Sequence, residues 1–268
     1  MPSCMLSVDN QAGVRRRALT VALSRVRLGD LLPERGHLMR RAIAACVLVT
    51  CLGLIAASAG AAANVLPPQA NAGGGSLSDW AKRFFIFDAA IPVVNDSHPA
   101  LDAGDVDCSI GQSGNVWFLE TTPDVVGDFE RRCSIPTGTK LYVPVFQWVC
   151  AEALDLIPVA ECLPQADAFL QELDLSLTVD GETLDRAALD AYRAATGVFQ
   201  LPLVEDSYWE WLTGVELADS IEFGSDAIGV LLHPLSVGTH EIVVTYASET
   251  FGFGGSLTYR ITVTPGAK

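Results

Sequence analysis

Two runs near the end of the chain, 240–247 and 257–263, alternate apolar and polar residues with a period of two. That period places every second side chain on one face of an extended chain, and no helix reproduces it. The pattern predicts two antiparallel strands, connected through a glycine-rich turn, each with one face against a core. The side chains expected on the core face are His240, Ile242, Val244 and Tyr246, followed by Leu257, Tyr259, Ile261 and Val263.

Further strands are predicted upstream of this pair. "NVWFLE" (115–120) and "TGTKLYVPVFQWV" (137–149) have strand composition, and "LSLTVDGETL" predicts a hairpin that turns at Asp180-Gly181. Pro144 cannot donate to a strand ladder, so the 137–149 strand is expected at a sheet edge or with a bulge. This strand is apolar on both faces, with Leu141, Val143 and Val145 on one and Tyr142, Phe146 and Trp148 on the other.

Two short helices are expected between these strands. Pro164 to Asp174 has the apolar spacing of a helix that begins at Pro164, and a second helix is expected from Asp185, as N-cap, to Tyr192. "WAKRFFIF" (80–87) fits either a short helix or a strand. The pattern as a whole predicts a mainly β fold: an antiparallel β-sandwich, Ig-like or jelly-roll-like, with one or two short helices.

The charge of the chain changes sign along its length. Residues 1–63 hold eight Arg and no Lys against three acids, a net charge of +5. Residues 64–268 hold nine basic residues against 29 acids, a net charge of −20. Nucleic-acid binding requires clustered Lys and Arg, so the acidic part excludes nucleic acid as a partner and disfavours anionic membrane surfaces.

The change of sign coincides with "MRRAIAACVLVTCLGLIAASAGAAA", residues 39–63. A basic head, an apolar middle and a small-residue end are the three parts of a secretory signal peptide. We therefore predict cleavage after Ala63 and contact with the membrane only during export. Met39 is the expected start, which makes residues 1–38 a dispensable or non-native extension.

Two alternatives to cleavage stay open. Residues 42–63 are long enough for an uncleaved anchor, and Cys46 could carry an acyl chain. Each alternative still places the rest of the chain outside the cytoplasm, in the periplasm or secreted. Within that rest, residues 64–79 are rich in Pro, Gly and Ala and are predicted as a flexible linker, and residues 80–268 as one globular β-rich domain.

Four cysteines follow the predicted signal peptide, an even set that indicates disulfides in an exported chain. Of the three pairings, we predict the two local ones, Cys108–Cys133 and Cys150–Cys162, each stabilising the fold by about 3 kcal/mol through loop entropy. A zinc site is the competing interpretation. It is disfavoured because the chain has no C-x-x-C pair and its histidines are distant in sequence.

Ser113 lies in "GQSGN" and invites comparison with a catalytic serine. The esterase pattern G-x-S-x-G has glycine where Asn115 stands, and it needs a strand before the serine, whereas the expected strand comes after it. A trypsin-like order, with His98 and Asp102 ahead of the serine, would leave only a short stretch between histidine and serine. A tight turn is the preferred interpretation, and Ser113 is kept only as a weak catalytic candidate.

Three acids in "LDAGDVDC", Asp102, Asp105 and Asp107, could surround a calcium ion, which binds several oxygen ligands. The EF-hand pattern is absent, and acidic runs of this kind are usually solvated loops. No other cofactor is expected from the sequence.

The stretch "VEDSYWEWL" (204–212) is the strongest candidate for ligand binding. As a strand it would place Trp209 and Trp211 on one face and Tyr208 and Glu210 on the other, and aromatic rings beside carboxylates are typical of sugar-binding surfaces. Glu210 together with Glu205 or Asp206 could supply a glycosidase pair. Tryptophan packed in a sandwich core is the alternative.

Three blocks of the sequence resemble a family of exported bacterial proteins of unknown function. "CSIGQSGNVWFLE" is similar to a C-x-x-GQSG-x-VWFL block, "RRCSIPTGTKLYVPVFQWVC" to an R-x-C-x-I-P-x-G block, and "VLLHPLSVGTHEI" to an L-x-P-L-x-x-G-x-H-x-I block. The resemblance covers most of residues 80–263 and implies export without implying any chemistry. The chain departs from the pattern at Phe84, Asn115 and Ile228-Gly229, where relatives tend to have Trp, Pro and an aromatic pair.

These observations predict a secreted, disulfide-stabilised β-sandwich of unknown activity. The favoured function is that of a non-enzymatic extracellular or periplasmic module that binds carbohydrate or other envelope components, with Tyr208, Trp209 and Trp211 as ligand-binding residues. The alternative is a secreted hydrolase of glycosides or esters that uses Glu210 or Ser113. A structural surface protein is the third interpretation.

Overall fold

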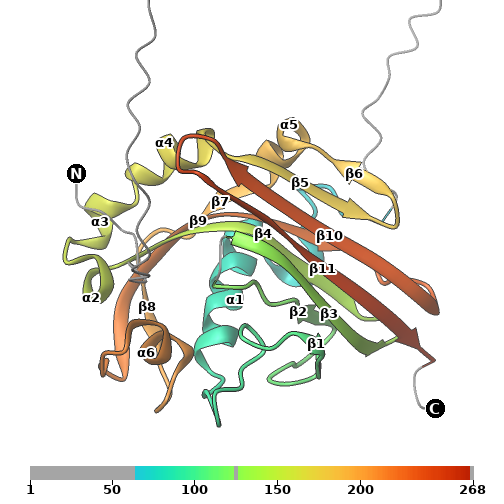
Figure 1. Ribbon diagram of the computed structural model, residues 1–268, viewed down its shortest axis with the longest axis horizontal. Helices are drawn as coiled ribbons and strands as arrows, with labels where there is room; N and C mark the ends of the chain where they lie inside the picture. The colour runs from blue at the N-terminus through green and yellow to red at the C-terminus, as the bar shows by residue number, and fades with distance from the viewer. Residues whose placement is uncertain (1–63, 124–125, 266–268) are drawn as a thin grey trace, which may run out of the picture. The chain divides into compact units, whose positions relative to one another are not determined.

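The computed structural model describes residues 64–123 and 126–265, in which two β-sheets pack face to face (Figure 1). The predicted extension and signal peptide lie outside the described residues. The six-stranded sheet has the order β1 (Gly104–Asp105), β3 (Val126–Pro136), β11 (Phe253–Thr264), β10 (Gly238–Ser248), β5 (Asp174–Val179) and β6 (Glu182–Leu184). The five-stranded sheet has the order β2 (Val116–Phe118), β4 (Lys140–Ala151), β9 (Ser220–Leu232) and β7 (Arg193–Ala195), with β8 (Phe199–Pro202) also paired to β9.

The predicted β-sandwich is confirmed. β10 and β11 are antiparallel, with Ile242 opposite Tyr259, and the side chains predicted to face inward are buried between the sheets, apart from half-buried His240. The sheets are mixed rather than purely antiparallel, because β3 pairs in parallel with β11 and β2 with β4. Alternation within a strand cannot give this feature, since parallel neighbours are distant in sequence.

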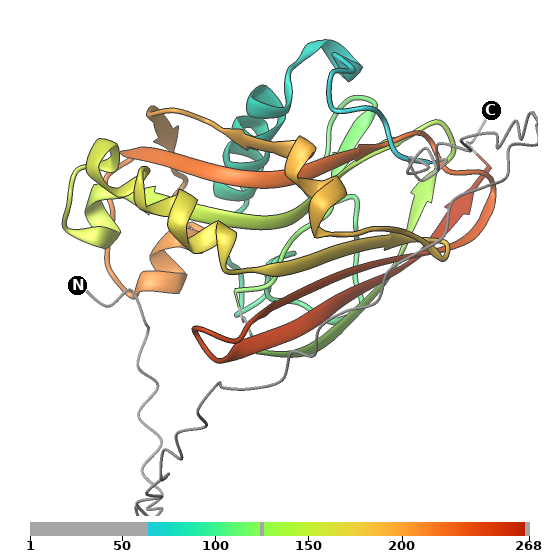
Figure 2. The ribbon, with the colours of Figure 1, turned by 90° about the horizontal axis from the view of Figure 1, so that it is seen from above.

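A helix forms a third layer over the five-stranded sheet. α1 (Leu77–Ala89) lies on the face of that sheet that points away from β10 and β11 (Figure 2). It begins at a capping box, in which Ser76 accepts from the Asp79 N–H while the Asp79 carboxylate accepts from the Ser76 N–H. Phe84 and Phe85 pack against β4 and β9 in a second core, so the 80–87 stretch is helical.

A bulge in β4 corrects the predicted faces of this strand. The pairing of β4 with β9 shifts by one residue between Pro144 and Phe146. One extra residue reverses the alternation, so Phe146 and Trp148 contact the same core as Val145, between the sheets. Tyr142, before the bulge, does face the other core, as predicted.

Both predicted helices form, and both end earlier than predicted. α4 (Gln165–Gln171), preceded by Pro164, stops before Asp174, which begins β5, and α5 (Arg186–Leu189), capped by Asp185, is followed by a 3-10 turn at Asp190–Tyr192. The Asp185 side chain accepts from the Ala188 N–H at 2.9 Å. A 3-10 turn, η1 (Ala72–Gly74), precedes α1. Further short helices connect the strands: the 3-10 turn η2 (Asp190–Tyr192), α2 (Glu152–Asp155), α3 (Val159–Cys162) and α6 (Tyr208–Thr213).

Part of the predicted flexible linker is packed against the sheet. Val65 pairs with Leu232 at the end of β9 and is buried, and the Leu66 N–H donates to the Leu231 carbonyl at 2.8 Å. An apolar residue in a Pro- and Gly-rich stretch can still add to a sheet where its backbone finds a ladder partner.

Both predicted disulfides are present. Cys108 is bonded to Cys133 and Cys150 to Cys162, with Cα–Cα distances of 5.8 Å in each. The first joins the loop before β2 to β3, and the second closes the α2–α3 connection onto β4. Within the described ranges, none of the helices combines the length and apolar character that crossing a membrane requires.

Candidate functional site

The stretch 204–212, predicted as a strand, contains most of the helix α6 (Tyr208–Thr213). Ser207 caps it, accepting from the Glu210 N–H, while the Glu210 carboxylate accepts from the Ser207 N–H at 3.0 Å. Gly214, with φ of 65°, ends it. Helical geometry separates residues two apart, so the prediction that Trp209 and Trp211 share one face is wrong.

The three aromatic residues of α6 have different environments. Trp209 is 5% exposed and packs against Phe85 and Phe223, with ring centroids 6.2 and 5.2 Å away. Tyr208 is also buried. Trp211 is 45% exposed, and its ring is stacked on that of Tyr208, with ring centroids 6.5 Å apart and an interplanar angle of 15°. Trp211 is therefore the ring of this group that a ligand in solvent can reach.

Trp211 lies on the wall of an open groove of about 820 Å³. One side is the segment after α1, around Val93, and the other is formed by α6 with the chain on either side of it. The two sides are joined at the base, where the Val93 N–H donates to the Asp206 carbonyl at 2.8 Å. The lining includes six carboxylates and no Lys, Arg or His: Asp96, Glu205, Asp206, Glu210, Glu216 and Asp219.

The Glu210 carboxylate connects the start of α6 to the segment that follows the helix. One of its oxygens accepts from Ser207 at the start of α6, and the other accepts from the Leu217 N–H at 3.0 Å. These hydrogen bonds, with that from Leu217 the largest, lower the pKa of Glu210. A general acid needs a raised pKa, so this geometry does not favour Glu210 as the acid of a glycosidase.

Beneath the groove, an aromatic stack leads into the protein. The buried His98 ring stacks on Tyr208, with centroids 5.0 Å apart and an interplanar angle of 18°. Its Nδ1 accepts from the Ala100 N–H at 3.1 Å, and burial lowers the pKa of His98 to about 4. His98 is therefore neutral at neutral pH and acts as a packed ring.

Two carboxylates are buried next to this stack. Asp88, the penultimate residue of α1, is 3% exposed, and Glu120, which follows β2, is 4% exposed. Burial raises the pKa of Asp88 to about 8, against a favourable contact with the Trp209 indole. Burial, and then the negative charge of Asp88, raise the pKa of Glu120 well above its usual value. The pair therefore keeps a proton at neutral pH.

The Glu120 carboxylate makes no hydrogen bond of normal geometry with the described residues, although the Thr121 N–H acts to lower its pKa. It faces a small cavity of about 20 Å³, which suffices for about one water molecule. Its neighbour Arg131 does not pair with it directly, although the guanidinium charge acts to lower the pKa of Glu120. The cost of an unpaired buried carboxylate makes this pair a candidate for a functional role.

Arg131 fastens the surrounding loops to the six-stranded sheet. Its guanidinium donates to the carbonyls of Ala100 and Asp102, on the segment after α1, and to that of Glu120, each at 2.7 Å. It also donates to the Tyr259 hydroxyl of β11 at 2.8 Å. A planar fork with five donors suits such a junction, and one side chain thereby fixes the backbone at Glu120 and just after His98.

Ser113 lies exposed in the loop before β2. Gly111 and Gly114 flank it with φ of 69° and 71°, the left-handed conformation of a tight turn. Among the described residues, no hydrogen bond joins Ser113 to a histidine or an acid. The neighbouring Gln112 is the structural residue of this loop, because its amide donates to the Phe118 carbonyl at 2.7 Å and accepts from the Phe118 N–H at 2.9 Å.

The three acids considered for calcium are directed to different partners. Asp102 accepts from Ser97, Asp105 pairs with Arg132 at 2.7 Å, and Asp107 accepts from Ser109. Within the described ranges, they do not form a compact group of carboxylates of the size that encloses a metal ion. Calcium binding there stays a sequence-based prediction.

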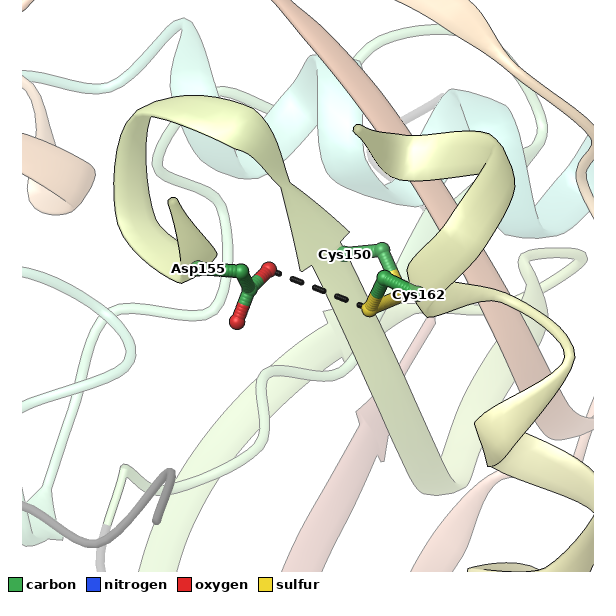
Figure 3. A group of neighbouring side chains, drawn as sticks. All are labelled: Cys150, Asp155 and Cys162. Carbon is green, nitrogen blue, oxygen red and sulfur yellow. Dashed lines mark hydrogen bonds between the residues drawn. A yellow bond between two sulfur atoms is a disulfide. The ribbon is translucent and has the colours of Figure 1, made fainter. Parts of the chain in front are cut away.

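The compact group of metal-ligand side chains that the described residues do form is Cys150, Asp155 and Cys162 (Figure 3). Here the two sulfurs are bonded to each other, so they are not thiolates. Asp155 lies 3.9 Å from the Cys162 sulfur and accepts from the Ala151 N–H at 2.8 Å, which fixes the turn that the disulfide closes. The group is structural in this state.

Comparisons with known proteins identify no family. No protein-family model matches the sequence, and no curated protein matches it significantly. Among solved structures, PbICP-C in complex with falcipain-2 is 11% identical, with a TM-score of 0.26 over 56% of this chain and 100% of that one. The cysteine protease inhibitor EhICP2 from Entamoeba histolytica is 12% identical, with a TM-score of 0.21 over 50% of this chain and 86% of that one. Amebosin is 9% identical, with a TM-score of 0.17 over 52% of this chain and 98% of that one. Likeness at this level supports no inference about this chain.

Proposed function

We propose that this chain is an exported binding protein whose binding surface is the groove beside Trp211, and that its ligand is a carbohydrate. The observation that carries the proposal is the exposed Trp211 ring on the wall of a groove of about 820 Å³. Tyr208 supports the ring from behind, so its orientation is set before a ligand arrives. A preoriented flat ring beside hydrogen-bonding groups suits the apolar face of a sugar.

The charge of the groove narrows the ligand class. Six carboxylates without a basic residue among the lining groups repel sulfated and uronic-acid saccharides. Neutral sugars and sugars that carry amino groups are the favoured ligands, because carboxylates accept hydrogen bonds from hydroxyl and ammonium groups. The resemblance to exported proteins and the two disulfides support a location outside the cytoplasm, where such glycans of the envelope would be met.

A glycan array tests this proposal. The full chain, expressed for export and purified with both disulfides formed, should bind neutral or amino-bearing glycans in preference to acidic ones. Trp211→Ala should weaken that binding about fivefold, since stacking on an aromatic ring contributes on the order of 1 kcal/mol. Phe251→Ala is the matched control, because Phe251 is another exposed aromatic residue, in the turn between β10 and β11.

The proposal fails if no glycan binds, or if Trp211→Ala binds as tightly as the wild type. Loss of binding in Phe251→Ala to the same extent would also contradict it, because that result would place the binding surface elsewhere.

A further inference from the structure

The buried acid pair and the groove meet at α6. We propose that the proton held by the Asp88–Glu120 pair controls the shape of the groove: its release displaces Trp209 and, through the same short helix, Trp211. The inference rests on the proposed function only in that it treats the groove as a binding surface.

The first step runs from Asp88 to Trp209. Asp88 is 3% exposed near the end of α1, whose other buried residues are apolar, and the Trp209 indole is the side chain whose interaction favours its ionised form. The indole nitrogen makes no hydrogen bond of normal geometry with the described residues. An ionised carboxylate needs donors, so loss of the proton draws either this N–H or water toward Asp88. Either response changes the packing of Trp209 against Phe85 and Phe223.

The second step runs from Trp209 to Trp211. α6 has only six residues, and its start is fixed by the Ser207–Glu210 capping box and by the Val93–Asp206 hydrogen bond. Tyr208 lies between His98 and Trp211, stacked on both rings. A helix fixed at its start and anchored in the core through Trp209 turns as a unit when that anchor moves. The exposed Trp211 ring then moves relative to the groove.

Other charged and titratable groups also lie around the pair. Arg131 of β3 carries a permanent positive charge, and burial lowers the pKa of His98 to about 4. Burial raises the pKa values of Tyr142 on β4 and Tyr259 on β11 above the usual range of tyrosine. Two further groups lie nearby: Asp102, a half-buried acid that accepts from Ser97 and lines the small cavity together with Glu120, and Tyr208 of α6 itself.

Indole NMR signals of the ligand-free full chain test the inference. The five tryptophan Nε1–H signals, assigned by Trp→Phe variants, are followed as the pH is raised from neutral to mildly alkaline. The signals of Trp209 and Trp211 should both shift with a midpoint near the Asp88 pKa of about 8, and neither should shift in Asp88→Asn. Trp148, which packs in the other core, is the control and should stay constant.

Each other result overturns the inference. If Trp209 does not titrate, the pair releases no proton that the helix senses. If Trp209 titrates and Trp211 does not, the groove is not coupled to the pair. Glu120→Gln serves as a second variant, in case Asp88→Asn does not fold. The charge of Asp88 raises the pKa of Glu120, so Glu120 is still protonated when Asp88 ionises, and the uncharged Gln should leave the midpoint of the Trp209 and Trp211 shifts unchanged within about half a pH unit. Loss of the titration in this variant contradicts its assignment to Asp88. Because no ligand is used, failure to bind any glycan refutes the proposed function separately.

Discussion

Replacing Asp88 by Asn should make the protein more stable, and increasingly so as the pH rises. Asn has the shape of the protonated acid and cannot ionise. The pKa of Asp88 is raised from 3.8 to about 8 in the folded protein, so the stabilisation of the protonated form is present in full below 3.8 and is lost as the pH rises toward 8. Asn cannot lose a proton, so the variant retains this stabilisation over the whole pH range.

The magnitude follows from the shift of the pKa. One pKa unit corresponds to about 1.36 kcal/mol. Between about pH 4 and pH 7, the free energy of unfolding of the wild type should therefore fall by about 4 kcal/mol relative to that of Asp88→Asn. Urea unfolding followed by tryptophan fluorescence, at about pH 4 and about pH 7, gives this difference directly. The contributions of acids that do not interact with Asp88 cancel, because these acids are common to the wild type and the variant.

Asp174→Asn provides the control for this experiment, since Asp174 is an exposed acid in β5. Its effect on the free energy of unfolding should be the same at both pH values. If Asp88→Asn likewise changes stability by the same amount at both, within about 0.5 kcal/mol, then Asp88 is not a buried acid that keeps its proton, and the reasoning is refuted.

Three further predictions concern stability. Arg131→Lys keeps the positive charge but loses the guanidinium that donates to four carbonyls and a hydroxyl, so the free energy of unfolding measured in urea should fall by about 3 kcal/mol. A decrease below about 1 kcal/mol would contradict the role of Arg131 as a junction. The Cys150→Ser, Cys162→Ser double variant should lose about 3 kcal/mol by the same measurement, and wild-type stability in the variant would show that the disulfide does not constrain the unfolded chain. Gln112→Ala should raise hydrogen exchange at the Phe118 N–H at least about tenfold, because that N–H loses its partner, and unchanged exchange would exclude this pairing.

The β-sandwich was predictable where a local pattern carries it. Alternation in β10 and β11 indicated which side chains enter the core, because a strand with one solvated face leaves that record in the sequence. The β4 faces were assigned wrongly beyond Pro144, since a proline allowed a bulge without locating it. The third layer was missed because "WAKRFFIF" is apolar enough for either a helix or a strand.

The site was predictable only in part. The sequence singled out residues 204–212, but as a strand, although Ser207 and Glu210 have the S-x-x-E spacing of a capping box that starts a helix. That signal could have corrected the arrangement of Trp209 and Trp211. The buried acids left a weaker trace: Asp88 follows an aromatic run and Glu120 follows "VWFL".

Tertiary structure decides the environment of those acids. Arg131 lies next to Glu120 because β3 pairs in parallel with β11, which places Arg131 opposite Tyr259, and no local pattern reports that register. Burial in this tertiary arrangement raises the pKa values of both acids, while the charge of Arg131 acts to lower that of Glu120.

The most direct test of the proposed binding surface is the indole NMR spectrum of the full chain, recorded while the tightest-binding glycan from the array is added. The Trp211 signal should shift in a saturable manner, while the Trp148 signal, from the core between the sheets, stays constant. A glycan that binds without moving Trp211, or that moves Trp148 instead, would contradict the assignment of the groove.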